Sequence, residues 1–296
     1  MIQTTIPVFR PLTMEDGKQF APLLLQSGHD GCEFSFTTLY MWRELYHTRI
    51  AQEGDYLLVS AGEGEKTSFL PPIGPSLGEG VALLRRAAEA QGLPLRLHGV
   101  DEQTLVQLQQ LFPLTVTEMD EDHDYLYKTT DLAELPGKAY HSKRNHIAAF
   151  SRQFDWQYED ITDDNLAEVF AMSKQWCREK GVCSDKGLKA ERCGIREVLS
   201  HRHAFGVRGG LIRVEGEVVA FAFGSPINDR VFDIHTEKAL TAYGGAYALI
   251  NRELARRLTD YDYLNRENDM GIEGLRRAKR SYRPSILLKK YSCEVR

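Results

Sequence analysis

Residues 261–284, YDYLNRENDMGIEGLRRAKRSYRP, place a short strand, a polar turn and a strongly basic helix in direct succession. The aromatic run at 261–264, with Asn265 behind it, predicts a strand with a polar edge. Asn268 or Asp269 can then cap the helix by accepting from its free backbone amides, where the helix dipole favours negative charge. This order of elements predicts an anion-binding site at the start of the helix.

One basic residue of this helix falls on its apolar side. At about 100° per residue, the apolar positions 272, 275, 278 and 282 form one arc, which includes Lys279. A buried ammonium group is costly unless something negative meets it. Lys279 is therefore predicted to contact a phosphate or a carboxylate. The alternative is a lysine that snorkels along an ordinary amphipathic helix.

The chain of 296 residues is long enough for two ordinary domains. We place them at residues 1–128 and 129–296. Thr13 and Thr162 each follow a strand and precede an apolar helix with acids in its first turn, which indicates a faint internal repeat. Strands that alternate with helices in both halves predict a mixed α/β fold.

Charge and composition limit the possible functions. A net charge of −5 excludes a uniformly basic nucleic-acid binder, but residues 274–291 hold seven Lys or Arg and no acid. A second basic cluster at 141–152 also suits phosphates. No run approaches the roughly 18 to 20 apolar residues of a membrane span, and the first residues do not resemble a signal peptide, so we expect a cytoplasmic protein.

The cysteines do not form a recognisable metal site. The five occur without a CxxC pair, which indicates reduced thiols. A zinc site built from Cys183, Cys193, His201 and His203 would match no standard ligand spacing. No metal is therefore predicted.

The strand predicted at 230–237 carries candidate acid–base groups. Strict alternation would place Asp233, His235 and Glu237 on one face. His235 and Glu237 are our candidates for taking a proton from an attacking amine or hydroxyl. The alternative is a strand face that is simply exposed to water.

The following segment, TEKALTAYGGAY at 236–247, has paired glycines ahead of a predicted helix. Bare backbone amides at Gly244, Gly245 and Ala246 would face a pyrophosphate. Paired glycines also occur simply to permit a tight turn.

The second half resembles the core of GNAT acyltransferases: a hairpin containing GEVVAFAFG, a third strand, a Gly-x-Ala helix start, another strand and a final helix. That superfamily's pyrophosphate loop has Arg or Gln, two residues, Gly, one residue, then Gly or Ala. This chain has Thr241 at the first position. Coenzyme A is therefore a disfavoured cofactor, and none is required.

A narrower resemblance covers nearly the whole chain. KAYHSKRNHIAAF and NRENDMGIEGLRRAKRSYRP are similar to the cytosolic C-terminal domain of phosphatidylglycerol lysyltransferases, which is related to the Fem peptidyltransferases. The resemblance implies tandem GNAT-like domains, each with a mixed, mostly antiparallel sheet flanked by helices. It also implies transfer of an aminoacyl group from aminoacyl-tRNA to a hydroxyl or amine on a lipid head group or small molecule.

The resemblance marks Lys279 and Arg276 as contacts to the phosphate of an acceptor or of the tRNA end, and Arg144 and Asn145 as residues beside the cleft. Arg283, Asn265 and Asn268 of the closing motif complete the predicted substrate contacts. Two alternative functions stay open at this point: a coenzyme A dependent N-acyltransferase, and a non-catalytic module that binds an anionic ligand.

Overall fold

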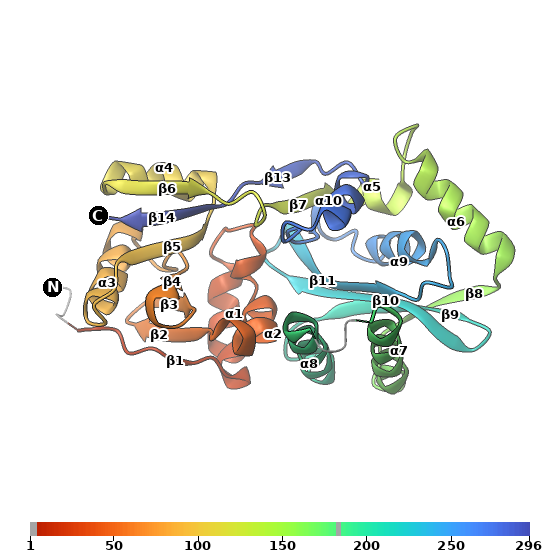
Figure 1. Cartoon of the computed structure of the whole chain (residues 1–296), viewed down its shortest axis with the longest axis horizontal. Coiled ribbons are helices and arrows are strands. Elements are labelled where there is room, and N and C mark those ends of the chain that lie inside the picture. Colours follow the sequence, from red (N-terminus) through yellow and green to blue (C-terminus); the bar gives the residue numbers. More distant parts are fainter. Residues whose placement is uncertain (1–4, 182–184) are drawn as a thin grey trace.

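The computed structural model describes residues 5–181 and 185–296, so Cys183 lies outside the described residues. Two seven-stranded sheets follow one another along the long axis of the molecule (Figure 1). Both are mostly antiparallel and flanked by helices, which confirms the predicted mixed α/β fold. No helix in the described ranges is long and apolar enough to cross a membrane.

The first sheet has the order β1-β2-β3-β4-β5-β14-β6. Its strands are β1 (Arg10–Pro11), β2 (Arg49–Glu53), β3 (Tyr56–Ala61), β4 (Ser68–Phe69), β5 (Leu95–Val100), β14 (Tyr291–Val295) and β6 (Leu114–Glu118). Its helices are α1 (Gly17–Leu25), α2 (Phe36–Tyr46), α3 (Leu77–Glu89) and α4 (Glu102–Leu111), with short 3₁₀ turns η1 (Met14–Asp16), η2 (Cys32–Phe34) and η3 (Gly64–Lys66).

The second sheet has the order β13-β7-β12-β11-β10-β9-β8. Its strands are β13 (Ile286–Leu288), β7 (Asp124–Lys128), β12 (Tyr263–Asn265), β11 (Val231–Ala239), β10 (Glu217–Pro226), β9 (Arg208–Val214) and β8 (Trp156–Asp160). Helices α7 (Leu166–Glu179) and α8 (Lys186–Ser200) lie below it in Figure 1, and α6 (His141–Gln153), α9 (Ala246–Ala255) and α10 (Glu273–Arg280) lie above. The short helix α5 (Thr129–Glu134) follows β7.

The sheets do not follow the boundary predicted between residues 128 and 129. Strand β7 precedes that boundary but pairs with β12 and β13 in the second sheet. Strand β14 follows it but pairs with β5 and β6 in the first sheet. Long-range pairing explains the difference, because β14 satisfies backbone groups of two strands that would otherwise be edges. The chain therefore crosses between the sheets after β6 and again after β13.

The two threonines of the predicted repeat make matching hydrogen bonds. The backbone amide of Thr13 donates to Asp16 Oδ2 across 2.7 Å, and that of Thr162 donates to Asn165 Oδ1 across 2.9 Å. In both cases the side chain of the residue three positions later accepts a hydrogen bond from the threonine amide. Two copies of one fold would give such matched openings.

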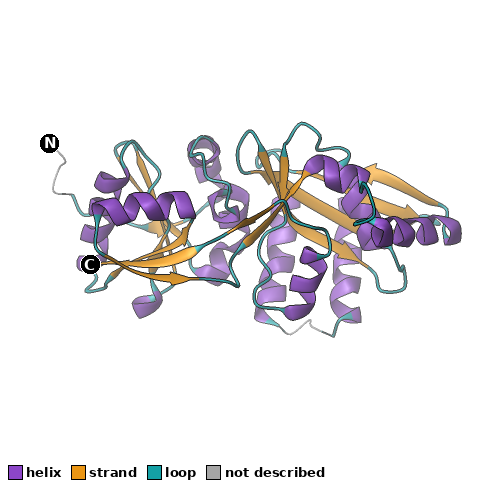
Figure 2. Cartoon of the chain, turned by 90° about the horizontal axis from the view of Figure 1, so that it is seen from above, coloured by secondary structure: helices purple, strands orange, loops and turns teal. Residues whose placement is uncertain are grey.

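Helices α1 and α2 lie between the sheets, and Figure 2 shows helices between the two sets of strands. One buried cluster includes Val59 of the first sheet and Phe223 of the second. The ring of Tyr40 on α2 lies 5.1 Å from that of Phe205, between centroids. A core shared in this way holds the halves together and fixes what lies between them.

Candidate active site

Strand β11 contains an extra residue at His235. Phe223 on β10 faces Thr236, whereas the next residue, Gly224, faces Ile234, so His235 has no partner in the ladder. This is a β-bulge, a device that re-aims side chains. Gly224 is required here, because a Cβ atom at this position would lie 1.8 Å from the carbonyl oxygen of Asp233.

The bulge separates the residues expected to share one face. His235 approaches Thr38 on α2, and Lys238 binds Glu191 on α8. Glu237 points to the opposite side, where it accepts from Asn251 on α9. The expectation that His235 and Glu237 share a strand face is wrong, because the extra residue reverses the alternation beyond it.

His235 is enclosed and surrounded by polar atoms. Its Nε2 atom lies 2.8 Å from Ser225 Oγ. Its Nδ1 atom lies 3.4 Å from each of three oxygen atoms, on Asp233, Glu267 and Thr38. The side chains of Asp233 and His235 are 0% exposed, whereas that of Glu267 is 22% exposed. Glu267 is therefore the member of this group that meets solvent.

The loop after β12 is held by two side chains, Asn265 at the end of β12 and Lys279 on α10. Asn265 donates to Asp124 Oδ2 across 2.8 Å, and its Oδ1 atom accepts from the Glu267 amide across 2.7 Å. Lys279 donates to the backbone carbonyls of Arg266, Glu267 and Asn268. Glu267 has a φ of 55°, which is uncommon for a residue with a side chain. These contacts stabilise that conformation and fix the position of the carboxylate.

The electrostatics of the group favour proton exchange near neutral pH. Burial raises the pKa of Glu267 to about 7, and the Asp233 carboxylate adds to the increase. Burial alone would lower the pKa of His235, but the charges of Asp233 and Glu267 raise it to about 9. A carboxylate that exchanges its proton near pH 7, beside an imidazolium, can act as a general base and then as a general acid.

In the structure, the side chains predicted to contact a phosphate bind other groups of the protein. Lys279 is buried, as predicted, but its ammonium meets three carbonyl groups rather than an anion. Arg276 forms two hydrogen bonds to Asp269, at 2.8 and 3.0 Å. Asp269 also accepts from Gly271, and α10 begins at Glu273 after Ile272, so the predicted cap at Asn268 or Asp269 is wrong.

The remaining predicted substrate residues lie apart from one another. Arg144 donates to the carbonyls of Leu135 and Gly137, and Asn145 lies 3.1 Å from His141 on the surface of α6. Asn268 contributes its carbonyl to Lys279. Arg283 is exposed beyond the end of α10. Their roles in substrate binding stay predictions.

Close packing explains one of the two glycines ahead of α9. Gly245 has a φ of 101°, and a Cβ atom there would lie 2.6 Å from the carbonyl oxygen of His146 on α6. Gly244 is exposed, and Ala246 is the buried first residue of the helix. Glu179 accepts from both the amide and the hydroxyl of Thr241. A carboxylate at this position opposes pyrophosphate binding.

Sequence reasoning missed Glu267, Thr38 and Ser225. Glu267 lies between Asn265 and Asn268, which were both predicted substrate contacts, so the NREND stretch itself pointed to this loop. Thr38 and Ser225 come from α2 and β10, and only the fold brings them to His235. Arg266 was also missed. It donates a hydrogen bond to Glu237, so the carboxylate predicted to act as a base is already paired within the protein.

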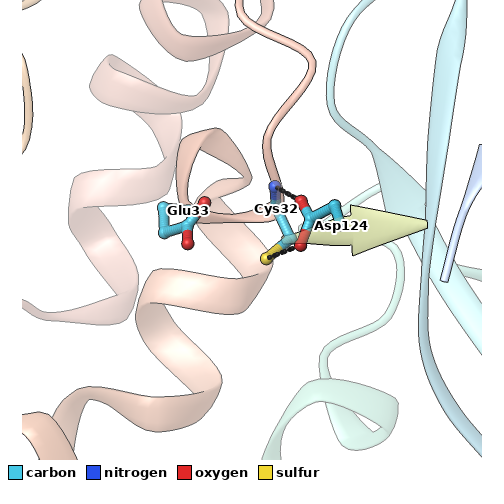
Figure 3. A group of neighbouring side chains, drawn as sticks. All are labelled: Cys32, Glu33 and Asp124. Atoms are coloured by element: carbon cyan, nitrogen blue, oxygen red, sulfur yellow. Dashed lines mark hydrogen bonds between the residues drawn. The ribbon is translucent and has the colours of Figure 1, made fainter. Parts of the chain in front are cut away.

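Three groups of described side chains are close enough to share a metal ion. Figure 3 shows one of them, in which Cys32 and Glu33 of η2 lie beside Asp124 of β7. The Lys290 ammonium already lies 2.7 Å from both Glu33 and Asp124, so it supplies the positive charge there. The second group is Asp233, His235 and Glu267, and the third is Glu118, Asp120 and His123.

Comparison with known proteins gives one family. Residues 26–294 match the model of the family described as phosphatidylglycerol lysyltransferase, C-terminal. The chain is also 22% identical over 182 residues to an uncharacterised protein of Mycoplasmoides gallisepticum. That match covers 58% of this chain and 56% of the relative, so the chain spans just over half of that protein.

Solved structures show the same fold. A conserved protein of unknown function from Bacteroides thetaiotaomicron is 35% identical, with a TM-score of 0.93 over 98% of this chain and 100% of that chain. L-PGS from Bacillus licheniformis is 15% identical, with a TM-score of 0.68 over 94% of this chain and 91% of that one. A tandem GNAT protein from the clavulanic acid biosynthesis pathway is 12% identical, with a TM-score of 0.50 over 97% and 98%. These likenesses confirm the tandem GNAT-like fold class.

Proposed function

The chain belongs to the family of phosphatidylglycerol lysyltransferase C-terminal domains, and we propose that it transfers an aminoacyl group from aminoacyl-tRNA to a hydroxyl or amine acceptor. The acceptor is a lipid head group or a small molecule. The observation that carries this proposal is the Glu267 carboxylate, the most exposed member of the Asp233–His235–Glu267 group, at the junction of the two halves.

The reaction requires one proton to move. The acceptor oxygen or nitrogen attacks the carbonyl carbon of the aminoacyl ester while Glu267 takes its proton. A new ester or amide bond forms, the bond to the ribose oxygen of the tRNA breaks, and Glu267 returns the proton to that oxygen. His235 does not touch the substrate: it positions Glu267 and balances its charge.

The basic surface of α10 supports a phosphate-rich donor. Arg276 and Lys279 are bound within the protein, so the arginines exposed on and just beyond this helix are Arg277, which pairs with Glu273 across 3.7 Å, Arg280 and Arg283. Arg277 is 76% exposed. Such side chains bind phosphates in a salt-dependent manner.

The donor can be tested by titrating charged tRNA and acetyl-CoA separately into the purified protein. We expect charged tRNA to bind, and the double change Arg280→Glu with Arg283→Glu to weaken that binding. Acetyl-CoA should give no saturable signal, because the Glu179 carboxylate bound to Thr241 opposes its pyrophosphate. Saturable acetyl-CoA binding without tRNA binding would favour a coenzyme A dependent N-acyltransferase. If neither ligand binds, the result would contradict the proposal and favour a binding module for another anion.

A further inference from the structure

The acidic segment EMDEDHD at 118–124 lies where the chain first crosses from one sheet to the other. Glu118 ends β6, and Asp120 and His123 lie in the connection to β7. Each offers one potential ligand atom, and these atoms lie within 4.8 Å of one another. None of the three belongs to the Glu267 group.

His123 is the unusual member of this cluster. It is 5% exposed, and its Nε2 atom has no hydrogen-bond partner among the described residues. The nearest carboxylate oxygen, Oε1 of Glu118, lies 3.7 Å away, beyond normal hydrogen-bond reach. A buried nitrogen without a partner costs free energy, and two carboxylates beside it would attract a cation.

We propose that Glu118, Asp120 and His123 bind a divalent cation of the zinc class, with water at the fourth position. Zinc bonds of about 2.0 to 2.2 Å place ligand atoms about 3.4 Å apart in a tetrahedron, so the 3.7 Å between His123 and Glu118 needs only a small adjustment. Calcium and magnesium prefer oxygen ligands alone, so the imidazole nitrogen favours zinc over either.

Lys289 competes for this site. Its Nζ atom lies 3.1 Å from Oε1 of Glu118, and its side chain is 41% exposed, so it can swing into solvent when a cation binds. Removing its charge should therefore strengthen metal binding. The bound ion would join the end of β6 to the start of β7 and so stabilise the crossing between the sheets.

The test is calorimetric titration of zinc chloride into the full chain after chelator treatment and removal of the chelator, with Cys193→Ser as background to eliminate an exposed thiol. One zinc per chain is expected. His123→Gln and the exposed change Asp120→Asn should each weaken binding by about tenfold or more. Lys289→Met should strengthen it, and Glu121→Gln, an acid of the same loop outside the group, should leave it unchanged.

A second measurement excludes effects of misfolding. Zinc should raise the melting temperature of the background protein and of Glu121→Gln by more than that of Asp120→Asn, with all of these folded by circular dichroism. Three outcomes would overturn the proposal: no zinc binding, equal binding by Asp120→Asn and Glu121→Gln, or a preference for calcium or magnesium over zinc.

Discussion

Lys279 holds Glu267 in place by donating from its Nζ atom to the Glu267 carbonyl oxygen across 3.1 Å. The same ammonium group donates to the carbonyls on either side, at Arg266 and Asn268. The basic helix α10 and the carboxylate of the site are thereby connected by one side chain. Lys279 is a positioning residue rather than a ligand contact.

Replacing Lys279 with methionine should destabilise the protein. The change keeps the length of the stem but leaves three carbonyl groups of a partly buried loop without their donor. The expected loss is about 2 kcal/mol or more in the free energy of unfolding, measured by urea denaturation. Arg280→Met, an exposed change on the same helix, should stay within about 0.5 kcal/mol. Equal effects of the two substitutions would show that the loop does not depend on Lys279.

The glycines at 224 and 244 should respond differently to alanine. A Cβ atom at Gly224 would lie 1.8 Å from the Asp233 carbonyl oxygen, whereas one at Gly244 would meet nothing within 4 Å. Gly224→Ala should therefore lower the melting temperature sharply or prevent folding, because the strands at the bulge cannot separate without losing their pairing. Gly244→Ala should fold normally. A stable Gly224→Ala protein would contradict the bulge geometry.

The sequence predicted most local elements because their signals are local. The strand at β12, the hairpin of β9 and β10 and the buried position of Lys279 follow from periodicity and turn residues. The placement of β14 between β5 and β6 was beyond such reasoning, because pairing between segments so far apart in the chain leaves no periodic trace.

The candidate site was only partly predictable for the same reason. His235 was found as a titratable residue on a strand, but the alternation that placed Glu237 beside it does not reveal a bulge. The partners of His235 come from α2, β10 and the loop after β12, so their meeting depends on the tertiary fold.

Lys290 should be important for the junction of the two sheets. Its buried ammonium lies 2.7 Å from both Glu33 and Asp124, so Lys290→Met would leave two carboxylates without a cation. The expected loss is about 3 to 5 kcal/mol in the free energy of unfolding. Lys289→Met, in zinc-free buffer, is the matched control at an exposed position and should not change the melting temperature measurably. If both variants melt alike, the buried charges do not stabilise this junction.

The pH dependence of aminoacyl transfer should follow the ionisation of Glu267. A general base works when deprotonated, so the rate should rise as the pH rises through about 7, the pKa of Glu267. The hydrogen bond and positive charge of His235 lower that pKa, so His235→Gln should move the midpoint to higher pH. A variant whose rate falls equally at every pH would indicate only a structural role for His235.

The most direct test of the central claim is single-turnover transfer from radiolabelled aminoacyl-tRNA, with vesicles of anionic lipid or a small amine as acceptor. Wild-type protein should move the label to an acceptor, and Glu267→Gln, which keeps the size of the side chain, should slow this step by about 100-fold or more. Glu217→Gln, at an exposed position at the start of β10, should react like the wild type. Transfer by Glu267→Gln at the wild-type rate, or no transfer by wild-type protein from any charged tRNA, would contradict the account.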